Sequence, residues 1–262
     1  MSVRSVFITG ASSGLGRGLA LHYANAGATV FAAARRVAEL ESLAQEVSAG
    51  AGRIVAVALD VGDLEALSSS IARAESESGG ALDLVIANAG IGIPTDARNL
   101  DWRAVERVFH VNTSAACTTV SAALPAMVAK NTGTVVAVAS LAGFRGMAGH
   151  AAYCASKAAL RTFMESLRVD LRGTGVRALT IYPGFVRTEM TAKNRFPMPF
   201  ILDADEAVRV MVRGIARGKR SIAYPLPLVL ATRWMATLPD FLYEFIASKL
   251  APQRLAKKRK SN

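Results

Sequence analysis

The chain is poor in cysteine. Its 262 residues include only Cys117 and Cys154, which stand in unrelated settings and lack the spacing of metal ligands. So few thiols exclude a disulfide framework and are typical of inert packing in a reducing compartment. We therefore expect no metal site and a cytoplasmic location.

Long hydrophobic runs are also missing. The longest apolar stretch lies near the C-terminus and is interrupted by Arg233, Asp240 and Glu244. It therefore falls short of the roughly 18 apolar residues that a membrane-spanning helix needs. The first residues, MSVRSVFITGASSG, run directly into a strand-like stretch without the separate apolar core or cleavage region of a signal peptide. The sequence predicts neither a membrane span nor a secretion signal.

Charged residues are scarce, and acidic residues are scarcer than basic ones. Charged residues form 19% of the chain against 52% for hydrophobic ones, which excludes a disordered chain. The net charge is +11, and residues 190–262 hold 14 basic and 5 acidic residues. An anionic membrane surface, an acidic partner or a solvated basic tail would each account for this excess. Nucleic acid is not favoured, because no zinc-finger, RRM or basic-zipper pattern accompanies the basic residues.

Six short apolar, β-branched runs alternate with longer segments rich in helix formers. The runs are VRSVFIT (3–9), ATVFAAA (28–34), RIVAVAL (53–59), LDLVIA (82–87), TVVAVAS (134–140) and VRALTIY (176–182). The helical segments are 14–26, 37–48, 64–78, 103–130 and 151–172. Runs that are apolar on both faces are expected of parallel strands buried beneath helices on either side. The pattern predicts an α/β fold with a doubly wound, Rossmann-like parallel sheet flanked by helices.

The character of the chain changes after Pro183-Gly184. No linker, low-complexity stretch or internal repeat divides residues 1–185, whereas RFPMPFIL (195–202) is apolar and irregular. A helix over about 203–217 and a short strand near 221–224 are expected next. We predict a single domain over residues 1–225, with a substrate loop at about 187–202. Residues 226–262 would add two short amphipathic helices and a basic tail, suited to an anionic membrane, a subunit contact or a flap over the pocket.

The first strand ends in the glycine-rich turn TGASSGLG. Its residues 10–16 place Gly10, Gly14 and Gly16 where a strand turns sharply into a helix, and glycine lets a phosphate approach the backbone there. The spacing GxxxGxG departs from the commoner GxGxxG fingerprint. We expect this turn to bind a dinucleotide through six residues: Gly10, Ser12, Ser13, Gly14, Leu15 and Gly16.

The end of the second strand lacks the acid that NAD-binding folds place there for the ribose 2′-hydroxyl. The sequence FAAARR has Ala34 near that place, followed by Arg35 and Arg36. Without the carboxylate nothing repels a 2′-phosphate, and guanidinium groups pair well with one. The sequence predicts NADP (NADPH) as cofactor. Two solvated arginines at the start of a helix would also account for this sequence.

Two further strand ends carry polar residues. Asp60 and Val61 follow the third strand, and Asn88, Ala89 and Gly90 follow the fourth. Ligands of open α/β sheets bind at the carboxyl ends of strands, so both turns lie where a cofactor would bind. Each could also be a plain turn.

Residues 151–160, AAYCASKAAL, carry Tyr153 and Lys157 among small residues. Their i,i+4 spacing places both on one helix face. Ser140 ends the fifth strand thirteen residues before the tyrosine. Alone, the pair would also suit a half-buried aromatic beside a solvated lysine.

Taken together, the motifs resemble the short-chain dehydrogenase/reductase family of the single-domain type. The resemblance runs from about Val3 to Thr188 and rests on TGASSGLG, Asp60, NAG, Asn112, Ser140, YCASK and Pro183-Gly184 in this order. It implies an NADP(H)-dependent oxidoreductase that interconverts a carbonyl and a secondary alcohol. It also implies a homodimer or homotetramer, because the fourth and fifth helices commonly pair between subunits.

The resemblance also assigns roles. Tyr153 would be the general acid/base, and Lys157 would lower the pKa of the tyrosine from about 10 and bond the nicotinamide ribose. Ser140 would hold the substrate oxygen, and Asn112 would keep a water-linked proton relay to Lys157. The nicotinamide end would be bound by Tyr153, Lys157, Pro183, Gly184, Val186 and Thr188.

The substrate is expected to be apolar. Beside Ser140 and Tyr153, its contacts would come from Phe144, Met147, Met190 and Phe196, although these apolar residues could instead close on each other. A different class of protein would use the same fold without turnover, as a nucleotide-sensing or membrane-associated binding protein. The complete set of Ser140, Tyr153 and Lys157 argues against that alternative.

Overall fold

A parallel sheet of seven strands forms the centre of the molecule. The computed structural model describes residues 3–192, 194 and 197–250. The strand order is β3-β2-β1-β4-β5-β6-β7, and every pairing is parallel. The strands are β1 (Ser5–Thr9), β2 (Thr29–Ala34), β3 (Arg53–Ala58), β4 (Leu84–Ala87), β5 (Gly133–Val138), β6 (Val176–Pro183) and β7 (Ser221–Tyr224).

The order of the strands reverses beside β1. The chain winds outward from β1 to β3, crosses back to β4 and winds outward again to β7. The carboxyl ends of β1 and β4 therefore border a crevice, because the crossovers leave these two strands in opposite directions. The predicted doubly wound sheet is confirmed.

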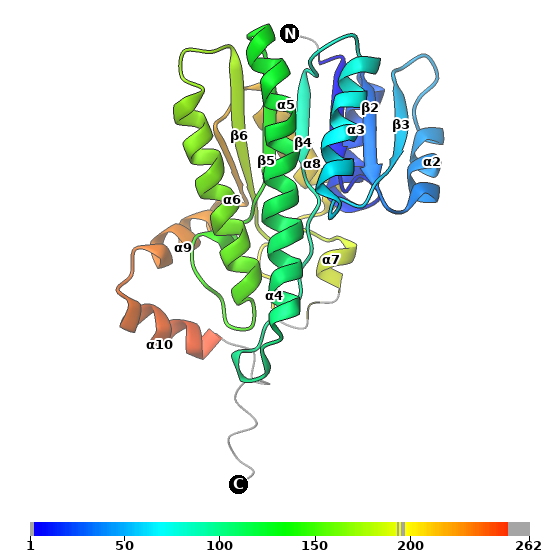
Figure 1. The fold of residues 1–262 in the computed structure, drawn as a ribbon. Coiled ribbons are helices and arrows are strands. Elements are labelled where there is room, and N and C mark those ends of the chain that lie inside the picture. The colour runs from blue at the N-terminus through cyan, green and yellow to red at the C-terminus, as the bar shows by residue number, and fades with distance from the viewer. Residues whose placement is uncertain (1–2, 193, 195–196, 251–262) are drawn as a thin grey trace.

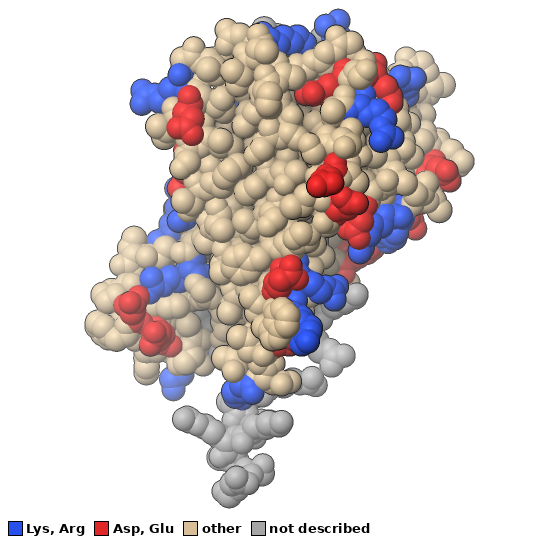
Figure 2. Space-filling view, in the orientation of Figure 1, with Lys and Arg blue, Asp and Glu red and all other residues tan. Residues whose placement is uncertain are grey.

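Helices cover both faces of the sheet (Figure 1). They are α1 (Gly14–Asn25), α2 (Val37–Gln45), α3 (Leu64–Glu77), α4 (Trp102–Phe109), α5 (Ala116–Lys130), α6 (Ala151–Asp170), α7 (Glu189–Ala192), α8 (Ala204–Ala216), α9 (Leu226–Ala236) and α10 (Asp240–Leu250). Successive strand residues feed different faces, since side chains alternate along a strand. Val6 and Ile8 pack with α1, α2 and α8, whereas Phe7 packs with α3, α5 and α6. Figure 2 shows the outside of this second face, where charged side chains gather at the rim and the area over α5 and α6 is largely uncharged.

The segment predicted as one helix over 103–130 is not regular. The α-helical hydrogen bonding of α4 gives way to a π-helical turn at His110–Ala115 before α5 begins. A π-turn holds one extra residue per turn and often lies at a functional site. Here the turn carries Asn112, a buried side chain with partners on two other elements.

The end of the described chain holds the two short helices expected there, α9 and α10. They follow β7 and lie beside the same edge of the sheet (Figure 1). None of the helices among the described residues combines the length and apolar character that crossing a bilayer requires.

Candidate active site

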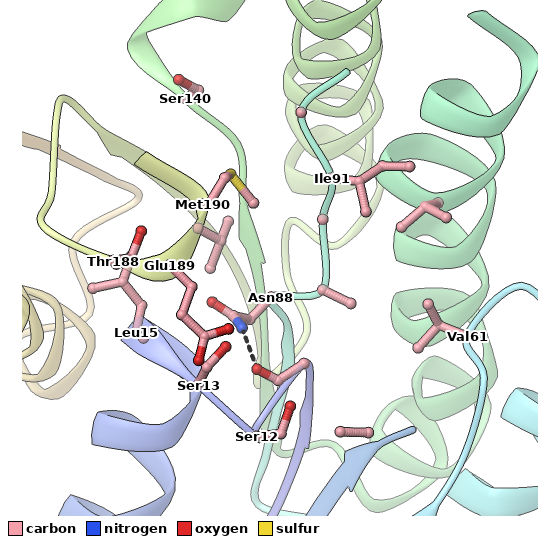
Figure 3. Close-up of a pocket in the computed structure, with 18 of the residues that line it drawn as sticks. Ser12, Ser13, Leu15, Val61, Asn88, Ile91, Ser140, Thr188, Glu189 and Met190 are labelled. Atoms are coloured by element: carbon pink, nitrogen blue, oxygen red, sulfur yellow. Dashed lines mark hydrogen bonds between the residues drawn. The ribbon is translucent and has the colours of Figure 1, made fainter. Parts of the chain in front are cut away.

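A cavity of about 810 Å³ opens at the carboxyl ends of the strands. The turns that follow β1 to β6 all contribute to its wall (Figure 3). Twenty of the residues predicted for the site line it: Gly10, Ser12, Ser13, Gly14, Leu15, Arg35, Arg36, Asp60, Val61, Asn88, Ala89, Gly90, Ser140, Tyr153, Lys157, Pro183, Gly184, Val186, Thr188 and Met190. Residues that lie up to 180 positions apart in the sequence thus meet at one crevice. Within the described part of the chain, no cluster of side chains could hold a metal ion.

The glycine turn has the shape that a phosphate group requires. Gly10 and Gly14 have φ values of 69° and 53°, in the left-handed region that favours glycine. A Cβ on Gly16, which lies outside the cavity wall, would come within 2.3 Å of the Gly10 carbonyl oxygen, so this glycine lets α1 pack against the turn. The side chain of Ser13 caps none of the first N–H groups of α1. Free N–H groups at a helix start are a favourable place for an anion, so the turn fits the pyrophosphate of a dinucleotide.

The turn after β4 is tied to the turn after β1. The Asn88 amide donates to the carbonyl oxygens of Thr9 at 3.0 Å and Gly10 at 3.2 Å, the second of which is drawn in Figure 3. The Thr9 hydroxyl accepts the backbone N–H groups of Asn88 at 3.0 Å and Ala89 at 3.1 Å. These four bonds fix the two sides of the crevice relative to each other.

Asn112 joins three elements from its buried position in the π-turn. Its side-chain oxygen accepts the Ile91 N–H at 2.8 Å, and its amide donates to the Ile91 carbonyl at 3.0 Å and to the Ser156 hydroxyl at 3.1 Å. Ser156 in turn donates to the carbonyl oxygen of Tyr153 at 2.8 Å. Asn112 therefore positions the turn after β4 against the helix that carries Tyr153.

Tyr153 and Lys157 lie together on α6, as their spacing predicts. The Lys157 Nζ lies 5.9 Å from the centre of the Tyr153 ring and donates to the Val138 carbonyl at 2.9 Å. The lysine is only 4% exposed, and burial lowers its pKa to about 8, because an apolar environment disfavours the charged form.

The pKa of Tyr153 is raised by burial, while a hydrogen bond with Ser140 opposes the rise. The direction is opposite to the lowered pKa expected from the sequence. The reason is that removing the phenolate from water outweighs the hydrogen bond in the protein alone. Ser140 lies across the cavity from α1, at the end of the strand that precedes α6 (Figure 3).

Both arginines after β2 already have acidic partners. The two terminal nitrogens of Arg36 face the two carboxylate oxygens of Glu189, at 3.3 Å and 3.1 Å, and its Nε donates to the Ser12 hydroxyl at 3.3 Å. Arg35 lies 3.8 Å from Asp60. The Glu189 side chain points toward the glycine turn (Figure 3). The ion pair between Arg36 and Glu189 links the turn after β2 to the segment after β6.

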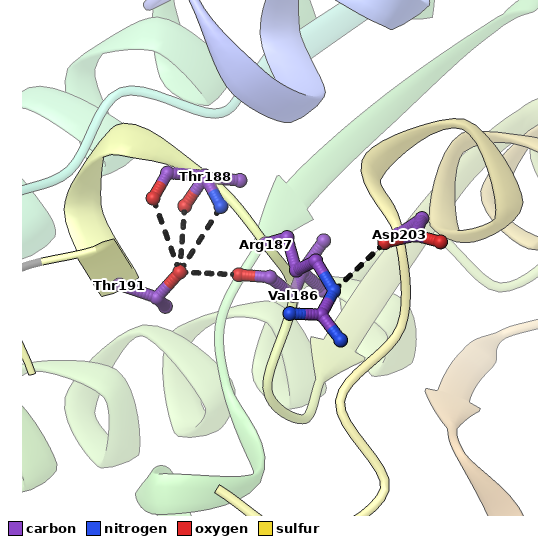
Figure 4. Close-up of polar contacts among 5 residues, drawn as sticks. All are labelled: Val186, Arg187, Thr188, Thr191 and Asp203. Atoms are coloured by element: carbon purple, nitrogen blue, oxygen red, sulfur yellow. Dashed lines mark hydrogen bonds and ion pairs between the residues drawn. The ribbon is translucent and has the colours of Figure 1, made fainter.

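The segment predicted as a substrate loop is closed at its base. The Arg187 N–H donates to the Leu202 carbonyl at 2.9 Å, and the Leu202 N–H donates to the Phe185 carbonyl at 3.0 Å. The Arg187 side chain also pairs with Asp203 at 2.9 Å (Figure 4). The two ends of the loop are therefore held side by side.

The hydroxyl of Thr191 holds the first turn of this loop. It donates to the Val186 carbonyl at 2.6 Å and accepts the Thr188 N–H at 3.0 Å (Figure 4). The Thr188 methyl group lies against Gly14, where an added Cβ would meet it at 3.1 Å. The loop thus begins in contact with the glycine turn.

The residues predicted for the substrate do not all meet. Met190 lines the cavity, whereas Phe144 and Met147 lie outside its wall. The Phe144 ring packs edge-on against Tyr182 of β6 at 5.1 Å, which accounts for its place outside the cavity, and Met147 is 37% exposed. Phe196 lies outside the described residues.

Several contributors to the site were not predicted from the sequence, among them Glu189, His110 and Ser156. Glu189 and His110 line the cavity, and Ser156 supports it from below. His110 contacts the Gly62 carbonyl through Nε2 at 2.7 Å. Helical spacing could have placed Ser156 beside Asn112 only if the π-turn had been known, and no local pattern indicates that Glu189 reaches Arg36.

The fold and the site define a class. A doubly wound parallel sheet, a glycine turn at its switch point and a tyrosine beside a buried lysine in the same cavity describe a nucleotide-binding oxidoreductase with a Rossmann-like fold.

Comparison with known proteins identifies the family. A family model for short chain dehydrogenases matches residues 4–198. An uncharacterized oxidoreductase of Myxococcus xanthus is 51% identical over 250 residues, which make up 95% of this chain and 98% of the relative. The chain belongs to the short-chain dehydrogenase/reductase family, whose members use nicotinamide cofactors.

Solved structures show the same fold with two different cofactors. A short-chain dehydrogenase from Sphingobium yanoikuyae in complex with NADPH is 26% identical, with a TM-score of 0.79 over 95% of this chain and 97% of that one. A short chain dehydrogenase/reductase from Burkholderia phymatum in complex with NAD is 22% identical, with a TM-score of 0.82 over 96% of each chain. The second likeness shows the fold alone.

Proposed function

We propose that the protein is an NADP(H)-dependent oxidoreductase that interconverts a carbonyl and a secondary alcohol on an apolar substrate. The observation that carries the proposal is that Ser140, Tyr153 and Lys157 line the same cavity as the glycine turn. The proton donor, Tyr153, and the dinucleotide-binding turn would then both face the substrate in this cavity.

The dinucleotide would lie along the carboxyl ends of the strands. The glycine turn would bind its pyrophosphate, Asp60 its adenine and the turn at Asn88 a ribose, while residues 183–188 would flank the nicotinamide. When bound, the nicotinamide supplies hydride transfer, and the protein supplies orientation and charge.

Tyr153 would hold the proton that the substrate oxygen gains or loses. Because burial raises the pKa of Tyr153, its hydroxyl stays protonated at neutral pH and is ready to donate during carbonyl reduction. Ser140 would hold the same oxygen by a hydrogen bond. Lys157, buried beside the tyrosine, would favour the phenolate that remains after the proton leaves.

Arg35 and Arg36 support NADP over NAD. Both line the cavity at the end where the adenosine would lie, and the position before them is Ala34 rather than an acid. A bidentate guanidinium suits a 2′-phosphate. The solved relative from Sphingobium yanoikuyae is in complex with NADPH, which is in keeping with the proposal.

An apolar substrate is supported by Met190 and Ile91, which line the same cavity as Ser140 (Figure 3). We further propose a cytoplasmic enzyme with one domain over residues 1–225, and a homodimer or homotetramer as the family commonly forms. A protein that binds nucleotide without turnover is the competing function, and the complete catalytic set argues against it.

The test follows oxidation of NADPH and of NADH over a panel of aliphatic, aromatic and steroid-like ketones. We expect turnover with NADPH to exceed turnover with NADH, and Tyr153→Phe to lower it by about 100-fold or more, because the acid is removed. Arg35→Ser with Arg36→Ser should abolish the preference for NADPH. Arg73→Ser, which removes an exposed arginine of α3 away from the cavity, is the control. Tight NADPH binding with no turnover on any ketone would contradict the proposal and favour the binding protein.

A further inference from the structure

Helices α9 and α10 present large apolar side chains to solvent. Trp234 is 59% exposed, Phe241 75% and Phe245 62%. The exposed apolar residues of the two helices are Leu226, Leu230, Trp234, Phe241, Leu242 and Phe245. Leu226, Leu230 and Trp234 repeat every four residues and so form one stripe along α9. Exposed patches of this kind mark interaction surfaces.

The opposite side of α9 is already used inside the molecule. Val229 is buried with Leu141 and Tyr182, and Leu228 packs against the same cluster. A Cβ on Gly184 would come within 2.7 Å of Leu228, which shows how closely α9 lies against the end of β6. The outward stripe is therefore held at a fixed place next to the active-site edge of the sheet.

Helix α10 is likewise fixed by one side. Arg145 pairs with Asp240 at 2.7 Å, and its guanidinium lies 4.4 Å from the centre of the Tyr243 ring. The Tyr243 hydroxyl donates to the Gly146 carbonyl. Phe241 and Phe245 lie on the remaining side, one helical turn apart, where they are left to solvent.

The charge around these helices has one dominant sign. Residues 226–262 contain seven basic and two acidic residues, and residues 251–262 alone contain five basic residues and no acidic one. One of the two acids, Asp240, is paired with Arg145. Lys249 lies 5.7 Å from the centre of the Phe245 ring, so a cation borders the aromatic stripe of α10.

We propose that the outward faces of α9 and α10, the docking face, bind the surface of an anionic lipid bilayer. Aromatic and leucine side chains on one side of a helix, flanked by basic residues, are the composition that binds the boundary between lipid headgroups and acyl chains. The basic residues of 251–262 follow directly and add attraction to anionic headgroups. The inference does not depend on the cofactor or on the reaction.

Charge favours lipid over a second copy of the chain as the occupant. Contact between two docking faces would bring together two segments 226–262, each with seven basic and two acidic residues. Like charges at an interface oppose association. An anionic bilayer instead neutralises them.

The test uses the full-length protein with large unilamellar vesicles of phosphatidylcholine alone or mixed with phosphatidylglycerol. We expect sedimentation with the anionic vesicles only, weakened by salt because the attraction is electrostatic in part. In a Trp102→Phe variant, Trp234 is the remaining tryptophan. Its emission should shift to shorter wavelength on anionic vesicles.

Phe241→Ser with Phe245→Ser should reduce partition at least tenfold. Trp102→Ser is the matched control, since Trp102 is 66% exposed on α4 and should not affect partition. NADPH binding and circular dichroism of both variants serve to establish folding. Unchanged partition in the double variant would overturn the proposal, because charge alone would then hold the protein. Absence of binding at low salt, or a smaller oligomer in the double variant by light scattering, would also overturn it, the latter in favour of a subunit contact.

Discussion

The charge of Lys157 destabilises the folded state. It is buried, and burial lowers its pKa from 10.5 to about 8. The unfolded chain therefore binds this proton more tightly than the folded one. The destabilisation is complete below about pH 8, and it disappears as the pH rises toward the unfolded value.

Replacing this lysine should raise the stability of the fold and abolish activity. We expect Lys157→Met to raise the free energy of unfolding at neutral pH by on the order of 2 kcal/mol, because a buried charge is removed and one hydrogen bond to Val138 is lost. The gain should shrink near pH 10, and turnover should be lost. Urea unfolding at both pH values measures this, with Lys130→Met on the exposed end of α5 as the control. A pH-independent change would contradict the argument.

Glu189 competes for the arginine that we assign to the 2′-phosphate. The ion pair between Arg36 and Glu189 must break before that phosphate can take both nitrogens. Both side chains are about half exposed or more, so the pair contributes at most about 1 kcal/mol.

Glu189→Gln should therefore tighten NADPH binding by about two- to fivefold and leave NADH binding unchanged. Fluorescence titration of both cofactors measures the effect. Glu46→Gln, which removes the partner of Arg17 at a distance from the cavity, should change neither affinity. Equal tightening of both cofactors would show that Glu189 acts on the pyrophosphate instead.

At the scale of elements, the strands could be predicted from the sequence, but the interruption of the helix over 103–130 could not. A buried parallel strand such as Val135 to Val138 is apolar on both faces, so its letters alone reveal it. The π-turn around Asn112 depends on partners at positions 91 and 156, which become neighbours only after folding. Local sequence therefore predicts whether a segment is a helix or a strand, whereas tertiary contacts determine where a helix departs from regular geometry.

The same division runs through the site. The glycine turn and the Tyr-Lys pair follow from short patterns whose spacing has a physical reason, whereas Ser140 was expected from the family resemblance. Phe144 is apolar and close in sequence to Ser140, yet it packs against Tyr182. Composition alone could not distinguish a side chain that faces the cavity from one that packs against the end of a strand.

The contact between the start of α1 and the first turn is an element-scale constraint. A Cβ on Gly16 would lie 2.3 Å from the Gly10 carbonyl oxygen and 2.5 Å from the Asn88 amide nitrogen. Gly16→Ala should lower the free energy of unfolding by about 1–3 kcal/mol and weaken cofactor binding, because the turn must move. Gly146→Ala, where a Cβ would meet nothing within 4 Å, is the matched control for thermal unfolding. Equal melting temperatures for the two variants would refute the constraint.

At the scale of the whole molecule, the largely uncharged face over α5 and α6 is where we propose that subunits pair (Figure 2). Val128 on α5 and Val169 on α6 are 44% and 65% exposed there. Val169→Arg should dissociate the assembly toward a monomer of 27.6 kDa, because a charge would be buried at the contact. Light scattering measures the mass, and Phe241→Ser with Phe245→Ser should leave it unchanged. A mass that Val169→Arg does not alter would place the contact elsewhere.

The hydrogen bonds between Leu202 and its neighbours Phe185 and Arg187 have a consequence for how such enzymes diversify. These hydrogen bonds join the two ends of the loop whatever residues the loop contains. The ion pair between Arg187 and Asp203 joins the same two ends. Insertions, deletions or exchanges within positions 192–201 should therefore leave the strand before the loop and the helix after it in place. If the loop contacts the substrate, as the sequence predicts, exchanging it would change the substrate preference while the sheet stays the same.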